Sequence, residues 1–233
     1  MAELQGIYAS FDNLTPAIAE ALWRDGYRVF SQQLWTAAEQ PANRVTNMRT
    51  ALQRGFTLVG PIAINGSTPG DIHVNKAREG VPDDIWNALA LVPIDVELEG
   101  IPNQQIRGAV ERCVGLGKRR SLYYSVHTWI DNQGDPAGFR DCLTYVARYD
   151  GVASLAFVQQ PPSMQGAFLV GKQYTNTLDS DGLETCREVW DAQLLIGTPP
   201  VAVDPIQAQL DFHSKVLVAH EGRIAALEAR KPA

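Results

Sequence analysis

Short apolar runs alternate with amphipathic stretches along most of this chain. The runs 56–64 (FTLVGPIAI) and 91–97 (LVPIDVE) are rich in apolar residues, which is typical of strands that are buried on both faces. The stretch 43–54 repeats its apolar residues at helical spacing and is followed by Gly55, a residue type that commonly ends helices. This alternation predicts parallel strands joined by right-handed helical crossovers.

The predicted strands share this apolar character and are 6–11, 28–34, 56–64, 91–97, 121–126, 152–158, 167–173 and 192–196. The predicted helices between them include 17–24, 43–54, 103–114 and 136–149. Eight such units predict an α/β fold of the (β/α)8 TIM-barrel type, with its last helices reduced. A doubly wound open sheet is the competing arrangement. No Gly-x-Gly-x-x-Gly follows the first strand, so a dinucleotide-binding version of that sheet has little support.

The chain changes character after Gly197. Residues 198–205 (TPPVAVDP) form a Pro-rich linker, in which the prolines oppose a helix. Over 206–233 we expect a coiled-coil helix, because seven positions follow an alternating four–three spacing: Ile206, Leu210, His213, Leu217, His220, Ile224 and Leu227. The predicted organisation is thus a barrel over 1–197, the linker, and a helix that joins copies of the chain, as a homotrimer in preference to a dimer. A single helix packed back on the barrel is the alternative.

Composition and charge exclude several classes of function. The chain of 233 residues is 45% hydrophobic and 20% charged, which provides for a substantial core. Its net charge of -6 argues against nucleic acid as the main partner. The three cysteines have unrelated spacings, so neither a disulfide framework nor a metal site is expected, and no cofactor is indicated. No membrane span or signal peptide is predicted, so synthesis in the cytoplasm is expected.

Two acids provide the strongest chemical signal. Asp95 and Glu97 alternate with Val96, so both carboxyl groups share one face of the predicted strand. They come where that strand ends, and barrel enzymes build their active sites at this end of the strands. Two carboxyl groups in a partly dry pocket push their pKa values apart, so one of them can serve as a general acid. The plainer alternative is that these acids cap the strand or neutralise an arginine.

Aromatic and amide residues recur at the other predicted strand ends. They include Tyr8, Trp35, Tyr123, Gln173 and Tyr174. Flat aromatic faces beside amide groups suit a sugar ring, which presents both C–H faces and hydroxyl groups. Each aromatic taken singly is also compatible with ordinary packing inside a barrel.

Several of these segments match one family in order and spacing. The segments are Gly6-Ile7, 26–30 (GYRVF), Asn47, 55–60 (GFTLVG), 91–97 (LVPIDVE), 122–125 (LYYS) with Trp129, 157–159 (FVQ), 173–175 (QYT) and Asp191. Over about residues 5–197 the chain resembles the family 25 glycoside hydrolases, the lysozyme-like muramidases common in bacteriophages. Each motif alone is weak, and the order of the motifs carries the resemblance.

The resemblance implies roles for the site residues. Glu97 would be the general acid and Asp95 its stabilising partner. Substrate contacts would come from Tyr8, Trp35, Tyr123, Gln173, Tyr174 and Asp191, the last of which falls where the family has an acid on its final strand. The first strand departs from the pattern, because the family has an Asp where this chain has Tyr8. A phenol with a pKa near 10 does not replace a carboxylate at neutral pH.

The resulting expectation is a peptidoglycan-directed, muramidase-like glycoside hydrolase whose partner is cell-wall glycan. Without a signal peptide, such a protein would reach a cell wall after lysis or as part of a virus particle beside other virion proteins. The alternative is a catalytically inactive phage tail or other virion component that binds glycan or only assembles. The altered first strand supports this alternative.

Overall fold

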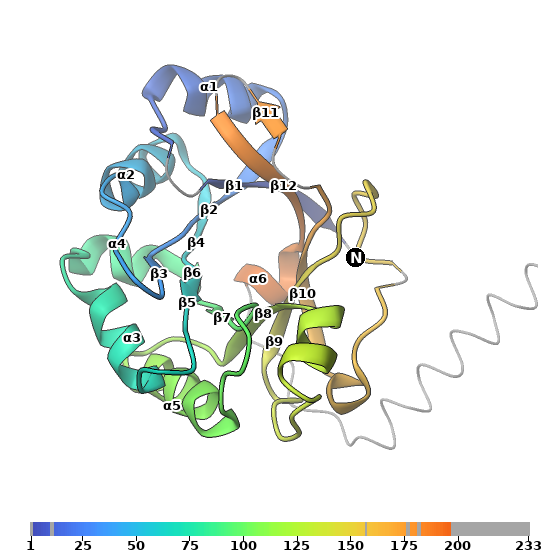
Figure 1. The fold of residues 1–233 in the computed structure, drawn as a ribbon. Helices are drawn as coiled ribbons and strands as arrows, with labels where there is room; N and C mark the ends of the chain where they lie inside the picture. The colour runs from blue at the N-terminus through green and yellow to red at the C-terminus, as the bar shows by residue number, and fades with distance from the viewer. Residues whose placement is uncertain (1, 10–11, 157, 176–177, 181–182, 197–233) are drawn as a thin grey trace, which may run out of the picture. The chain divides into compact units, whose positions relative to one another are not determined.

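The computed structural model describes residues 2–9, 12–156, 158–175, 178–180 and 183–196. The predicted linker and coiled-coil helix, 198–205 and 206–233, lie outside these residues. The described part is a mixed α/β fold in which the strands form one curled sheet and most helices lie outside it (Figure 1). Among the described helices, none is both long and apolar enough to cross a membrane.

The strands are β1 (Glu3–Ala9), β2 (Tyr27–Gln32), β3 (Trp35–Thr36), β4 (Thr57–Val59), β5 (Ile62–Ala63), β6 (Leu89–Leu91), β7 (Ile94–Asp95), β8 (Ser121–Ser125), β9 (Leu143–Ala147), β10 (Phe168–Gln173), β11 (Leu178–Ser180) and β12 (Leu183–Asp191). The α-helices are α1 (Pro16–Arg24), α2 (Arg44–Arg54), α3 (Gly70–Arg78), α4 (Asp83–Ala88), α5 (Asn103–Gly115) and α6 (Ala192–Ile196). A π-helical turn (Thr128–Asn132) and a 3-10 turn (Pro162–Met164) complete the described elements.

The sheet has the strand order β3-β5-β7-β8-β9-β10-β12-β1-β2-β4-β6, and β11 pairs with β12 beside this path. Most neighbours are parallel, whereas β12 runs antiparallel to both β1 and β10. Short breaks divide three strands into the pairs β2 and β3, β4 and β5, and β6 and β7. The first pieces, β2, β4 and β6, follow β1 in the sheet, and the second pieces, β3, β5 and β7, neighbour β8.

Local sequence explains where the early helices begin and end. The Thr15 hydroxyl accepts from the Ile18 amide at 3.2 Å and caps α1, whose first residue is Pro16. Helix α2 ends at Gly55, which takes the left-handed conformation with φ of 103°. The capping threonine and the terminating glycine are both visible in the sequence, and both helices lie where they were predicted.

The second half of the chain departs from the predicted alternation. Residues 143–147, predicted as the end of a helix over 136–149, form strand β9, and all five of its residues are buried. The predicted strand 152–158 is not formed among the described residues of that segment. The predicted strand 192–196 is helix α6, and the last strand is β12 instead. The regular (β/α)8 alternation is therefore found only in the first half. The segments 126–142 and 148–167, which connect β8 to β9 and β9 to β10, contain a π-helical turn and a 3-10 turn in place of a long α-helix.

The sheet separates two hydrophobic layers. The outer layer lies between the sheet and the helices, and the inner layer fills the curl of the sheet. Trp190 of β12 is fully buried in the inner layer. It fits because the neighbouring strands carry glycines there: a methyl group added at Gly6 would lie 2.7 Å from the Trp190 Nε1 atom, and one added at Gly171 would overlap the same indole. Leu195 of α6 packs into the same layer.

The glycine at position 6 is thus required by the space that Trp190 occupies. We predict that Gly6→Ala lowers the free energy of unfolding by about 1–3 kcal/mol, the usual cost of overpacking. The matched control is Gly108→Ala within α5, where the nearest atom to an added methyl is the Asp71 amide nitrogen at 3.9 Å. The control should raise the free energy by about 0.5–1 kcal/mol through helix propensity. Urea unfolding checks both, and equal effects of the two changes would contradict the packing argument.

Candidate active site

The two predicted acids lie at the end of β7 where it meets β8. Ile94 and Val96 pack into the outer layer, so the alternating Asp95 and Glu97 face the inside of the curled sheet. Asp95 is in register with Tyr123 of β8. Both carboxyl groups are half-buried. The structure therefore places them together on the inner face, at the C-terminal ends of the parallel strands.

The surroundings of these acids favour their protonated forms. Burial raises the pKa of Asp95 to about 8, and the Glu97 carboxylate adds to the rise, while the Glu97 amide, which donates to Asp95 Oδ1 at 3.1 Å, opposes it. Burial also raises the pKa of Glu97, against a hydrogen bond with Tyr123 that favours the charged form. Two such neighbours titrate as a pair. Burial and the nearness of the two carboxyl groups therefore oppose the presence of two charges on the pair.

An aromatic and amide cluster adjoins the acids. Gln173, at the end of β10, accepts at Oε1 from the Tyr123 hydroxyl at 2.6 Å and from the Tyr149 hydroxyl at 3.0 Å. Burial and the charge of Glu97 raise the pKa of Tyr149 to about 12, and burial raises the pKa of Tyr123 well above its ordinary value. Both phenols are thus neutral hydrogen-bond donors. Of the predicted residues, Tyr123 and Gln173 belong to this cluster.

A third acid, Glu188 of β12, lies fully buried inside the sheet. Its Oε2 atom accepts from the Ser31 hydroxyl at 2.7 Å and from the Trp190 indole at 2.9 Å, and its Oε1 atom accepts from the Tyr145 hydroxyl. Burial raises the pKa of Glu188 to about 7, although these three hydrogen bonds favour the charged form. Both the charged and the neutral form of this carboxyl group are therefore populated near neutral pH.

A stack of rings joins this third acid to the first two. The Tyr145 ring lies 4.5 Å from the Tyr123 ring and 4.5 Å from the Trp190 ring, centroid to centroid. Glu188 and Tyr145 were not among the predicted site residues. Tyr145 fell within the predicted helix 136–149, and no element was predicted over 183–191, which holds Glu188. The available signal was the alternation of Glu188 and Trp190 within the run that forms β12.

Tyr8 of β1 also belongs to the inner face, because its neighbours Ile7 and Ala9 pack into the outer layer. The Tyr8 hydroxyl donates to Gln33 Oε1, and Gln33 Nε2 donates to the Trp35 carbonyl oxygen at 2.7 Å. The position at which the resemblance expects an Asp is thus occupied by a half-buried phenol that hydrogen-bonds an amide.

Two of the predicted substrate-binding residues, Trp35 and Tyr174, lie away from the inner face of the sheet. The Trp35 indole donates to His73 Nδ1 at 2.8 Å and packs against the outer layer. The Tyr174 ring is buried in a small separate cluster, and its hydroxyl donates to Gln5 Oε1 at 3.0 Å. The Trp35 indole is turned toward α3 by its contact with His73. Tyr174 points outward because it directly follows the inward-facing Gln173 on its strand.

Asp191 lies at the opposite end of the sheet. It pairs with Glu3, the first residue of β1, because β12 runs antiparallel to that strand. Its Oδ1 atom accepts from the amides of Gln193 and Leu194, both at 2.9 Å, which is the contact of a helix cap at the start of α6. The structure therefore does not bring Asp191, a predicted substrate-binding residue, together with Asp95 and Glu97.

No set of three or more His, Cys, Asp or Glu side chains among the described residues is arranged to hold a metal ion. The chemical groups that the site offers are thus carboxyl, phenol and amide groups. A proton held between two carboxyl groups can be transferred to a leaving group, and the remaining carboxylate can stabilise positive charge. This arrangement suits acid-catalysed cleavage of a glycosidic bond.

Comparison with known proteins gives a match of fold. No protein-family model matches the sequence, and no curated protein matches it. The muramidase from Acremonium alcalophilum matches with a TM-score of 0.65 at 17% identity, covering 83% of this chain and 97% of that one. The bacterial lysozyme from Streptomyces coelicolor gives 0.66 at 14% identity, covering 84% and 96%. A family 25 glycosyl hydrolase from Bacillus anthracis gives 0.64 at 12% identity, covering 83% and 92%.

The described part of the chain therefore has the fold of the family 25 glycoside hydrolases. This confirms the resemblance that the ordered motifs indicated. At identities of 12% to 17% the likeness is one of fold, so the chemistry has to be argued from the side chains of this chain.

The buried Glu188 makes stability depend on pH. A raised pKa means that the folded state binds this proton more tightly than the unfolded state does. The free energy of unfolding therefore falls as pH rises from about 4.5 to about 7. We predict that Glu188→Gln removes a pH-dependent part of the free energy of unfolding of up to about 3 kcal/mol between about pH 5 and about pH 8. Urea unfolding at both pH values measures it. The control is Glu20→Gln, an exposed partner of Arg54, and an unchanged pH dependence in Glu188→Gln would contradict the prediction.

Proposed function

We propose that this protein binds the glycan of bacterial cell walls and cleaves its glycosidic bonds as a muramidase does. The observation that carries the proposal is the pair Asp95 and Glu97, half-buried side by side on the inner face, where burial raises the pKa of both carboxyl groups. The shared fold with the muramidases and the lysozyme named above supports it.

In the proposed reaction the pair gives its proton to the glycosidic oxygen. Following the resemblance, Glu97 is the acid and Asp95 the carboxylate that stabilises the positive charge developing on the sugar ring. Burial raises the pKa of both carboxyl groups, and the Glu97 charge adds to the rise at Asp95, so two charges on the pair are opposed. Tyr123 and Gln173 provide an aromatic face and hydrogen-bonding groups beside the acids.

A second candidate function is glycan binding without cleavage. Tyr8 favours it, because this phenol occupies the position at which the resemblance expects a carboxylate on the first strand. In that case the pair of acids would bind hydroxyl groups, and the chain would serve as a recognition module, for example in a virus particle. Activity measurements separate the two functions.

We predict that Glu97→Gln abolishes cleavage while leaving the fold intact, since it removes the proton donor but keeps the shape. The loss should be on the order of 10² to 10⁴ in rate, the usual contribution of general acid catalysis. Clearing of purified cell walls, followed by turbidity, is the measurement.

The matched control is Glu79→Gln, an exposed partner of Lys76, which should clear walls as fast as the wild type. Equal clearing by Glu97→Gln would exclude Glu97 from the mechanism. A wild type that binds wall glycan without clearing it would favour the recognition module.

We further propose that the chain self-associates through the heptad pattern of 206–233. Each oligomer would then carry one glycan-binding site per copy of the chain. The positions His213 and His220 fall on the predicted seam, so protonation below about pH 6.5 should weaken the association. Sedimentation of the full chain and of a version ending at residue 197 is the measurement. We predict an oligomer, with a trimer preferred, that becomes a monomer on truncation. A full-length monomer at micromolar concentration would exclude this assembly.

A further inference from the structure

The segment that follows β9 folds back along the outside of β10. The Arg148 amide donates to the Gln173 carbonyl oxygen at 2.8 Å, and the Gly151 amide donates to that of Tyr174 at 2.9 Å. We call residues 148–156 the 148–156 loop. It carries Tyr149, whose hydroxyl contacts the site while 53% of the residue stays exposed. An exposed ring held at its hydroxyl end is thus presented beside the two acids.

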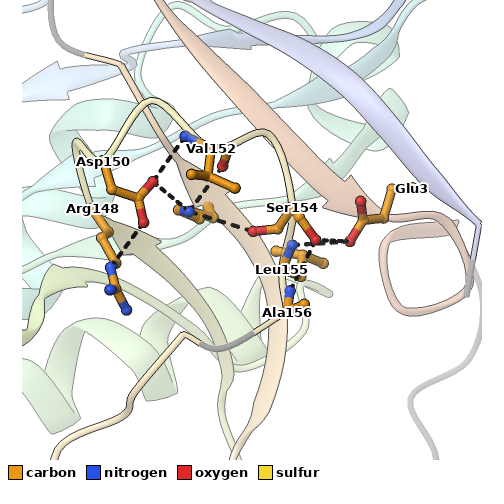
Figure 2. A network of polar contacts seen from close by, with 8 residues as sticks. Glu3, Arg148, Asp150, Val152, Ser154, Leu155 and Ala156 are labelled. Atoms are coloured by element: carbon orange, nitrogen blue, oxygen red, sulfur yellow. Dashed lines mark hydrogen bonds and ion pairs between the residues drawn. The ribbon is translucent and has the colours of Figure 1, made fainter. Parts of the chain in front are cut away.

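A buried cation lies beneath this loop. Lys172 of β10 is 1% exposed, and its Nζ atom donates to Asp150 Oδ1 at 2.7 Å, to the Val152 carbonyl oxygen at 2.9 Å and to the Ser154 carbonyl oxygen at 3.4 Å. Three acceptors satisfy the three hydrogens of the ammonium group. Figure 2 shows Asp150, Val152 and Ser154 brought together by the curve of the loop. Because a buried charge without partners is strongly destabilising, Lys172 favours this one conformation of the loop.

Further polar contacts fix both ends of the loop. Asp150 Oδ2 pairs with Arg148 Nε at 3.0 Å, and Asp150 Oδ1 accepts from the Val152 amide at 3.0 Å. Burial alone would raise the pKa of Asp150, but the Lys172 hydrogen bond and the nearby positive charges hold it below its ordinary value. At the far end, Glu3 Oε1 accepts from the Leu155 amide at 2.9 Å, as Figure 2 shows. The loop is therefore tied to β10 and to β1.

Two consecutive residues of β10 point to opposite sides of the sheet. Lys172 points outward to the loop, and Gln173 points inward, where its Oε1 atom accepts from the hydroxyls of Tyr123 and Tyr149. The end of one strand thus holds the loop from outside and the Tyr149 hydroxyl from inside. Tyr149 is close enough to the acids for the charges of Glu97 and Asp95 to act on it.

We propose that Tyr149 is a glycan-binding residue of this site, and that Lys172 is the positioning residue that holds it there. Its exposed ring offers a face on which the C–H groups of a sugar can stack, next to the bond that the acids would cleave. This proposal rests on the proposed function. It adds to the site an aromatic contact, the Tyr149 ring, and the residue that orients this ring, Lys172.

The test is a double-mutant cycle on the full chain. Glycan strands freed from purified peptidoglycan by an amidase serve as the probe, and calorimetric titration measures their dissociation constant. We expect Tyr149→Ala and Lys172→Met each to weaken binding roughly three- to tenfold, the contribution of one aromatic contact. The double variant should bind no more weakly than Tyr149→Ala, because both changes remove the same contact. If the chain clears walls, both changes should raise KM and leave kcat within about twofold.

Two variants guard against a trivial loss of structure. Asp150→Asn removes the charge that faces Lys172 but keeps the shape of the partly exposed side chain, and it should weaken binding in the same direction by a smaller factor. Lys76→Met, a change at an exposed lysine, should leave binding unchanged. Losses that multiply in the double variant, or a Lys172→Met protein that binds like the wild type, would overturn the positioning role.

Amide hydrogen exchange separates this proposal from the function on which it rests. Exchange over 148–156 should be faster in Lys172→Met than in Lys76→Met, and equal exchange would overturn the role of Lys172 whether or not glycan binds. A wild type that binds no glycan strand would overturn both the proposed function and the role of Tyr149.

Discussion

The filling of the curled sheet is the constraint on which the rest of this structure depends. A curled sheet encloses a space that side chains have to occupy without voids. Here the Trp190 indole fills it, which is compatible only with glycine at positions 6 and 171 of the neighbouring strands. Tyr145 stacks on that indole and Tyr123 stacks on Tyr145. The ring stack extends from the packed interior to the acids, so their positions follow from the packing beneath them.

Burial in this interior also determines the charges of the site. Water would hold the carboxyl groups of Asp95, Glu97 and Glu188 ionised at neutral pH, but their surroundings raise the pKa of each. Glu188 has three hydrogen-bond donors and still titrates near neutral pH, which shows how strongly complete burial acts. The half-buried pair remains accessible from the strand ends. Carboxyl groups of raised pKa thus lie where a bound molecule can reach them, and this is the property on which the proposed catalysis depends.

The fold and the activity of this chain are separate properties. The fold is shared with muramidases and a lysozyme, yet the first strand carries Tyr8 where the resemblance expects an acid. Folds host several functions, and activity belongs to the side chains of the site. The two acids at the end of β7, the phenol of Tyr149 and the buried Lys172 are features of this chain, and the proposed glycan-binding site depends on them in either a cleaving or a binding form.

The sequence alone determined the first half of the fold and the central pair of acids. Buried parallel strands are continuous in apolar residues, and helix caps and glycine stops are local signals, so the first strands and the helices α1, α2 and α5 were predicted, whereas α3, α4 and the breaks within the strands were not. The alternation that places Asp95 and Glu97 on one face was predictable as well. The tertiary structure alone decided the second half. Residues 143–147 carry apolar residues at helical spacing, yet they form β9 because both faces of that segment are covered. The antiparallel direction of β12 placed Glu188 inside and Asp191 at the far end. Strand direction and two-sided burial arise from contacts between segments distant in sequence, and local patterns do not encode them.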